Sequence, residues 1–382
     1  MHQLAKAKQE GCLRDSILHF FQFKKMNDSL GATPTSNQNR KASSDPKLIE
    51  QVFLEGARKL FDREKNVFFF EIVDCMKGKG SIESPFYFPP CCISKGTDLF
   101  LKMIDSLITK NKLNSDVCRY IRSACLMFKI LVPANYEETL SQYPQFPIIL
   151  YNDCYRIAHE LELMNLKYSV SDDNPAMLMD VAANLRLMAE SERRKCINKH
   201  VVICNSYLLE TKKFTDIYNM KQNKKAIEKI LDHLDHLKRL WSQVLDANNA
   251  LVMTSIAEIL EPILKTMCGY ILDINDIGET ESQDINTLFS MFTKWLSTNF
   301  SFPDSEIVKF IPSLPAFRSI SSIMIISLND IIEDLKCTNV ENRKLQGLSS
   351  NELVKLIKAI FQDSEKRREA ISLSSKLPIN SK

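Results

Sequence analysis

Scarcity of glycine is the feature that most restricts what this chain can fold into. Nine of its 382 residues are glycine, which is about a third of the usual frequency. Barrels, sandwiches and nucleotide-binding α/β folds use glycine in turns and in phosphate-binding loops. With 45% hydrophobic residues, an ordinary globular value, the composition therefore predicts a globular protein built mainly from helices.

Apolar residues recur at helical spacing along most of the chain from residue 46 onward. Asp45 is placed to cap the first helix, with Pro46 at its first position. Later helices are predicted at roughly 94–111, 115–131, 146–167, 174–211 (as one helix or two), 222–246, 248–272, 284–298, 316–336 and 350–372. There is no fixed repeat of about 33 to 47 residues. The pattern therefore predicts an all-α fold in which antiparallel helix pairs stack into an elongated rod.

Three regions are expected along the chain. Residues 1–45 are predicted to be a variable and partly disordered segment, because 27–45 are polar and poor in hydrophobic residues. Residues 46–211 and 212–382 are predicted to form two helical-bundle regions.

One stretch departs from the helical pattern. Residues 66–75 are aromatic and β-branched, which favours a strand. No partner strand is visible, so a buried helix end or an extended segment fits equally well. Residues 77–90 hold three prolines and two glycines and are predicted to be a loop.

Charge and cysteine content restrict the possible functions. The net charge of +3 gives no strong global field for nucleic acid. Eleven scattered cysteines without a C-x-x-C pair indicate free thiols in a reducing compartment. The first 21 residues have no apolar h-region followed by a small-residue cleavage site, so no secretory signal is expected in them. No apolar run reaches the roughly 18 to 20 residues that span a bilayer. A cytoplasmic protein is expected.

The C-terminal stretch 349–371 reads as one amphipathic helix. Ser349 and Glu352 have the spacing of a capping box. A stripe running from Leu353 to Phe361 predicts a buried face, on which Phe361 should be buried. The polar side is expected to be available to a partner through Lys355, Lys358, Arg367 and Arg368.

A histidine-rich stretch raises the possibility of a metal-dependent helical-bundle enzyme. Asp232, His233, Asp235 and His236 are residue types that bind metals. On a helical wheel, however, the apolar stripe includes Trp241, which should be buried, while His233 lies at the edge of the stripe and His236 opposite it. A solvated helix face is therefore the favoured interpretation, with no metal and no cofactor.

Two basic runs raise the alternative of a helical nucleic-acid-binding protein. They are residues 191–195, around Arg193, and 221–225, around Lys224. Neither has the interleaved aromatic residues of a single-strand platform, so solvated surfaces are favoured. The motifs G-x-S-x-G, H-E-x-x-H, G-x-x-x-x-G-K-[ST] and G-x-G-x-x-G do not occur in the chain.

Four segments stand out by their order along the chain: FYFPPCCISKGTDLFLKMI, FPIILYNDCYRIAHELELM (with Asn152, Cys154, Ala158 and His159), HLKRLWSQVLDANNALVMTSIAEILEPIL and NELVKLIKAIFQDSEKRREAI. Together they resemble the zeste-white-ten family of centromere/kinetochore proteins. The resemblance covers about residues 46–378. Its specificity comes from the colinear order of the segments, because no single one is diagnostic.

The resemblance implies a non-enzymatic scaffold subunit with an all-helical tethering-complex fold. At kinetochores in mitosis it implies partnership with Rod and Zwilch, which recruit dynein and spindle-checkpoint proteins. At the cytoplasmic face of the endoplasmic reticulum it implies a tethering complex with SNAREs, peripheral membrane association and no direct nucleic-acid contact. Family members carry a long N-terminal half, and this chain is expected to begin after most of it, as a fragment, a short isoform or an imperfect gene model.

Overall fold

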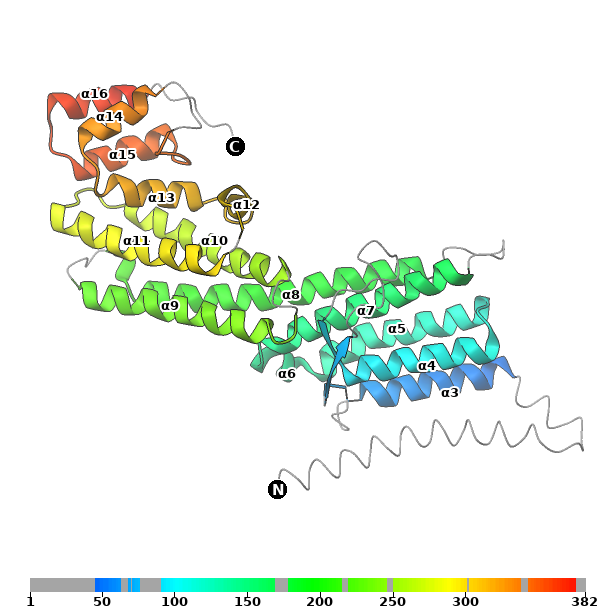
Figure 1. Ribbon diagram of the computed structural model, residues 1–382. Helices are drawn as coiled ribbons and strands as arrows, with labels where there is room; N and C mark the ends of the chain where they lie inside the picture. Colours follow the sequence, from blue (N-terminus) through cyan, green and yellow to red (C-terminus); the bar gives the residue numbers. More distant parts are fainter. Residues whose placement is uncertain are drawn as a thin grey trace, which may run out of the picture. The chain divides into compact units, whose positions relative to one another are not determined.

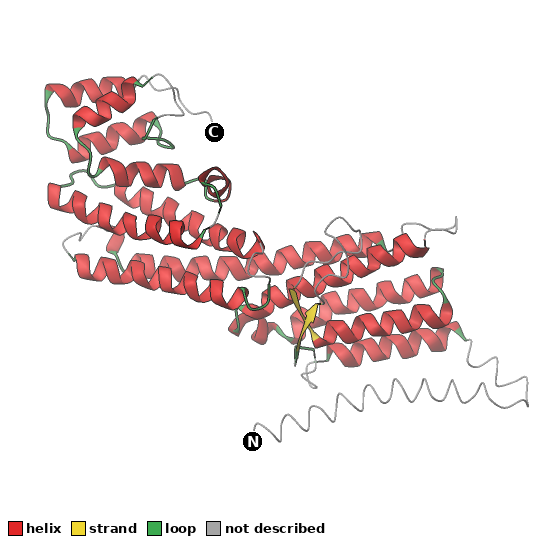
Figure 2. Cartoon of the chain, in the orientation of Figure 1, coloured by secondary structure: helices red, strands yellow, loops and turns green. Residues whose placement is uncertain are grey.

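The computed structural model describes residues 45–62, 68–69, 71–75, 91–168, 178–214, 219–245, 250–300, 302–337 and 343–375 (Figure 1). The expected disordered stretch 27–44 and the expected loop 77–90 lie outside these residues. Within the described part, helices dominate and one pair of short strands accompanies them (Figure 2). The predicted all-α helical-bundle class is therefore confirmed.

The helices fall into two groups along the chain. The first contains α3 (Pro46–Phe61), α4 (Lys95–Asn111), α5 (Ser115–Asn135), α6 (Glu137–Gln142), α7 (Gln145–Tyr168) and α8 (Met179–Leu209). The second contains the 3-10 turn η2 (Lys212–Phe214), α9 (Met220–Trp241), α10 (Ala250–Leu272), α11 (Glu279–Asn299), α12 (Asp304–Phe310), α13 (Leu314–Ile323), α14 (Leu328–Lys336), α15 (Ser350–Ile360) and α16 (Glu365–Ser374).

The chain divides into two compact units by its internal packing. Unit 1 comprises residues 1–196 together with 240–247, and unit 2 comprises 197–239 together with 248–382. The change from one unit to the other falls inside α8. That residues 46–211 and 212–382 form two separate helical-bundle regions stays a prediction.

The stretch with strand propensity does find a partner strand. Strand β1 (Ile72–Cys75) pairs antiparallel with β2 (Cys91–Ser94), with Ile72 opposite Ser94. The sequence pattern hid this partner because β2 is only four residues long and runs directly into α4, where Ser94 caps the helix. A bridge from Cys91 to Leu245 also brings the end of unit 1 against this strand.

Aromatic rings fill the core of unit 1 where α3, α4 and α5 meet. Phe61 lies edge-on to Phe100 and to Phe128, with ring centroids 5.2 and 5.7 Å apart. Phe68 packs into the same group and lies so close to Gly96 that a Cβ there would be 2.2 Å from the Phe68 ring. Gly96 is therefore one of the few glycines that the fold requires.

The core of unit 2 forms where α13 packs against α10 and α11. Phe289 of α11 stacks on Phe317 of α13 with ring centroids 4.1 Å apart, and Phe292 meets the same ring edge-on. Helix α10 has buried residues along nearly its whole length, among them Ile256 and Ile263. Burial of such side chains is the main stabilising term for a bundle of this kind.

Two predicted helices are each broken in the structure, and serine causes both breaks. The range 316–336 divides into α13 and α14, because Ser327 caps α14 and accepts a hydrogen bond from the Asp330 amide. The range 350–372 divides into α15 and α16, because Ser364 caps α16 by accepting from the Arg367 amide. Both serines have extended backbone, as an N-cap residue does, and so lie outside the helix that each one caps.

Burial of Phe361 was predicted wrongly for the same reason. Phe361 is the C-cap of α15, its backbone is extended and its side chain is half-buried. The fully buried residues of this face are instead Leu353, Leu356 and Ile357, one to two turns earlier in the helix.

Trp241 is buried, as predicted. Its indole Nε1 donates to the carbonyl oxygen of Pro144 at 3.0 Å, and residues 240–247 belong to unit 1. The helical register used to place Trp241 is therefore confirmed. That Trp241 packs inside a bundle of the predicted helices 222–246 and 248–272 stays a prediction.

Alanine substitution should show that Ile357 is buried and Phe361 only half-buried. Ile357→Ala should lower the free energy of unfolding by about 2 to 5 kcal/mol, the range for a buried aliphatic side chain. Phe361→Ala should cost less, because Phe361 is already partly in water. Urea unfolding followed by circular dichroism measures both, and an equal or larger loss at Phe361 would contradict the C-cap assignment.

Fluorescence should report the environment of Trp241. The chain has two tryptophans, so Trp295→Phe leaves Trp241 as the single emitter. We expect blue-shifted emission that acrylamide quenches poorly, because the indole is enclosed and hydrogen-bonded to Pro144. Emission like that of indole in water would rule out this packing.

Candidate interaction surface

Helices α14, α15 and α16 pack together at the C-terminal end of unit 2. The capping box of α15 forms as predicted, since the Ser349 side chain accepts from the Glu352 amide and Glu352 accepts from the Ser349 amide. Ser350 Oγ donates to the carbonyl oxygen of Ser374 at 2.7 Å, which ties the start of α15 to the end of α16. The helix pair is therefore closed by polar as well as apolar contacts.

The four basic residues predicted to meet a partner lie on two helices rather than on one. Lys355 and Lys358 are exposed on α15. Arg367 is half-buried and its Nη2 donates to the carbonyl oxygen of Lys358 at 3.2 Å, near the end of α15. Arg368 forms an ion pair with Asp363 at 3.1 Å and holds the pKa of that carboxyl below its usual value. The two arginines thus make contacts within the chain.

The histidine-rich stretch does not converge on a common point. His233 lies 3.1 Å from His200 of α8, Nε2 to Nδ1, whereas His236 is exposed and lies beside Arg239. Asp235 accepts a hydrogen bond from Trp295 Nε1 at 2.8 Å. Across the described residues, no three histidine, cysteine or acidic side chains are grouped so as to hold a metal.

The contact between His200 and His233 was not predicted. Burial lowers the pKa of His200 to about 4, and burial also lowers the pKa of His233. Both rings are therefore neutral near pH 7, and one can donate to the other. The pairing joins α8 to α9 across 33 residues of sequence, a relation that helical periodicity within one segment cannot reveal.

The two basic runs differ in their surroundings. Arg193 is buried, and its Nε donates to Glu190 at 3.1 Å. Glu190 also accepts from the hydroxyl groups of the stacked pair Tyr151 and Tyr155, so Arg193 belongs to an internal network. Lys224 of the second run is exposed. The first run therefore does not provide Arg193 as a phosphate contact.

Two neighbouring residues of α7 join the separate pieces of unit 1. Asn152 Nδ2 donates to the carbonyl oxygens of Cys92 and Val244 at 2.8 and 3.2 Å. Asp153 accepts from the Ser94 amide at 2.8 Å, at the start of α4. Asn152 was among the residues that carried the family resemblance, while no sequence pattern singled out Asp153.

Asp153 is a carboxyl group enclosed by protein. It is fully buried, and its second oxygen, Oδ2, has no hydrogen-bond partner; the same is true of Thr97 Oγ1. Burial raises the pKa of Asp153 to about 7, an effect that the hydrogen bond from Ser94 partly offsets. The side chain therefore changes charge near neutral pH instead of near pH 4.

The structure defines an all-α protein of two helical units, with one pair of short strands among the described residues. None of the described helices is both long and apolar enough to cross a membrane. Two family models match the chain: "Centromere/kinetochore protein zw10, C-terminal" over residues 86–210, and "ZW10 C-terminal helical domain" over residues 225–373. The chain belongs to the ZW10 family and matches its C-terminal region.

Relatives from several animals agree with this assignment. The zw10 homologue of Rattus norvegicus is 21% identical over 313 residues, and zw10 of Drosophila melanogaster is 23% identical over 295. The homologue of Caenorhabditis elegans is 21% identical over 332 residues. All three are named centromere/kinetochore proteins. The matches cover 75% of this chain and 39 to 41% of each relative, so the chain spans about two fifths of their length.

The raised pKa of Asp153 leads to a test of its burial. From about pH 4 to about pH 7 the unfolded chain has lost this proton while the folded chain keeps it, so wild-type stability falls as the pH rises. Asp153→Asn does not titrate. The unfolding free energy of Asp153→Asn minus that of the wild type should rise across this window by on the order of 4 kcal/mol, at about 1.4 kcal/mol per pKa unit, and then level off.

Thermal melts at steps from pH 4 to pH 8 measure this difference. Asp105→Asn, at an exposed site on α4, is the matched control and should show no such growing gain. A difference between Asp153→Asn and wild type that stays constant with pH would contradict a buried, proton-binding Asp153.

Proposed function

We propose that this chain acts as a non-enzymatic scaffold region within kinetochore protein complexes during mitosis. The observation that carries the proposal is the colinear match of two family models, which together extend from residue 86 to residue 373. The relatives found are named centromere/kinetochore proteins. A scaffold role needs helix faces that stay folded while they bind other proteins.

The finer assignment rests on the family resemblance. At kinetochores the chain would join a Rod-like large helical subunit and Zwilch, and so support dynein recruitment and checkpoint signalling. At the cytoplasmic face of the endoplasmic reticulum it would join tethering subunits and SNAREs that capture Golgi-derived vesicles. Its membrane association would then be peripheral and made through partners.

Within unit 2 we place one partner-binding surface on α15. Lys355 and Lys358 are exposed there, and α15 packs against α16. Arg367 and Arg368 would contribute mainly by holding α16 in place, through the Lys358 carbonyl and through Asp363. Exposed basic side chains at the rim of an interface affect the association rate and its salt dependence more than stability.

Charge reversal on α15 tests whether Lys355 and Lys358 bind a partner. Lys355→Glu with Lys358→Glu should weaken capture of the Rod-like subunit from mitotic extract and leave the melting temperature nearly unchanged. The matched control is Lys110→Glu with Lys129→Glu, two exposed lysines of unit 1. Quantitative precipitation at low and at physiological salt measures the effect.

Each result decides a different part of the proposal. Failure of the wild-type chain to recover Rod and Zwilch from mitotic extract would overturn the kinetochore assignment. Recovery that is undiminished by the α15 double variant would retain the scaffold role but remove α15 from the interface.

A further inference from the structure

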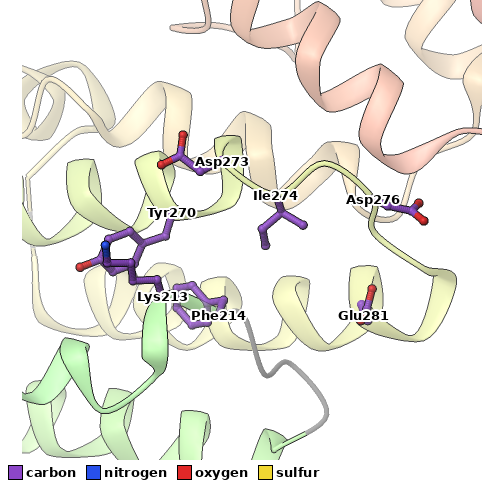
Figure 3. A pocket seen from close by; sticks show the side chains of 7 residues that line it. All are labelled: Lys213, Phe214, Tyr270, Asp273, Ile274, Asp276 and Glu281. Atoms are coloured by element: carbon purple, nitrogen blue, oxygen red, sulfur yellow. The ribbon is translucent and has the colours of Figure 1, made fainter.

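A pocket of about 310 Å³ lies in unit 2, between the turn η2 and the end of α10 (Figure 3). Its side chains do not form a ligand site. Phe214 is fully buried, and the carboxylates of Asp273, Asp276 and Glu281 do not point toward one another. A surface of a different kind lies in unit 1, on the outward side of α5.

Helix α5 has an apolar face that points away from the helices on which it packs. Phe128 marks the inward side, because its ring meets Phe61 of α3 and Phe100 of α4. Leu126 and Ile130 lie two residues before and after Phe128, about 200° around the helix, and therefore on the opposite side. These two residues are 50% and 65% exposed.

The apolar character of the outward side is confined to the second half of α5. In the first half, Arg119 and Arg122 form ion pairs with Glu50 and Asp180. Single exposed apolar residues are common on proteins, whereas a contiguous group of them marks a binding surface. We call the exposed and half-buried apolar residues of the second half the α5 patch: Leu126, Met127, Ile130, Pro133 and Ala134.

A segment outside the described residues has the composition to cover this patch. Residues 12–26 read CLRDSILHFFQFKKM, in contrast to the polar stretch 27–45 that follows. Leu13, Ile17, Phe20 and Phe21 have the i, i+4, i+7, i+8 spacing of one helix face. Burial of such aliphatic and aromatic side chains is favourable, so the segment has a driving force to pack on an apolar surface.

The described part of the chain begins beside α5. Tyr120 Oη donates to the carbonyl oxygen of Pro46 at 2.9 Å, at the start of α3. Ile130 lies about 15 Å further along α5 than Tyr120. The roughly 20 residues between Phe23 and Pro46 can extend up to about 70 Å, so the segment can reach the whole patch. Such a tether gives it an effective concentration on the order of millimolar, which favours it over a segment of another protein.

We propose that residues 13–23 dock on the α5 patch of the same chain, with Leu13, Ile17 and Phe21 packed against Leu126 and Ile130. The patch is then covered within the chain and is not a surface for another subunit. The proposal goes beyond the scaffold assignment, and it does not depend on the α15 surface.

Hydrogen exchange of the intact chain, followed by mass spectrometry, tests the docking. The amides of residues 13–23 should exchange on the order of tenfold more slowly than in a free peptide of the same sequence, because exchange requires the segment to leave the patch. Leu126→Asp with Ile130→Asp places two charges on the patch. This variant should return the exchange of residues 13–23 to the rate of the free peptide.

A matched control changes apolar residues elsewhere. Val202→Asp with Leu209→Asp alters two residues of α8 in unit 2 that are 67% and 57% exposed, and it should leave the exchange of residues 13–23 unchanged. Circular dichroism melts verify that each variant is folded. A photoreactive p-benzoylphenylalanine in place of Ile130 should cross-link to residues 13–23 within one chain, and the same group in place of Leu209 should not.

Slow exchange in the wild type that is lost only in the α5 variant, together with cross-links from position 130 within one chain, would support the proposal. Fast exchange in the wild type would overturn it, and so would slow exchange that persists in the folded α5 variant or an equal loss in the control. Slow exchange that disappears on dilution, or cross-links between two chains, would also overturn it, because a second copy would then cover the patch.

Discussion

The side-chain amide of Asn152 holds together parts of unit 1 that lie far apart in the sequence. It donates to two carbonyl oxygens, those of Cys92 and Val244, which precede and follow it by 60 and 92 residues. The amide of Cys92 in turn donates to the Val244 carbonyl at 2.8 Å. A buried backbone carbonyl that has no hydrogen bond costs free energy. The side-chain amide of Asn152 donates to one carbonyl in each of two separate segments. These contacts position the small sheet, and the neighbouring Asp153, which accepts from the Ser94 amide, positions the start of α4.

Much of the helical content could be predicted because the physical cause is local. Asp45 caps α3, Ser349 and Glu352 cap α15, and the apolar stripe of α9 buries Trp241. The errors arise where local signals compete. Ser327 and Ser364 each lie within a stretch of helical spacing, yet each starts a new helix. Hydrophobic periodicity continues across each break, because the helix on either side buries an apolar face of its own.

The candidate surfaces were less predictable, because they depend on contacts between distant segments. A wheel drawn for α9 places His233 at the margin of the apolar stripe but cannot indicate that His200 of α8 faces it. The basic residues near the C-terminus look alike in sequence. Only the packing of α16 on α15 distinguishes the exposed Lys355 from Arg367, which donates to a carbonyl of the preceding helix.

The discontinuity of unit 1 has a consequence for synthesis of the chain. Its last segment, 240–247, is made only after residues 197–239, which belong to unit 2. Until that segment leaves the ribosome, Pro144 and Cys92 lack the Trp241 and Val244 groups with which they bond. Domains usually fold as their residues emerge. Unit 1 therefore cannot complete its core until residues 197–239 of unit 2 have been synthesised. A nascent chain that ends before residue 240 lacks the last segment of that core.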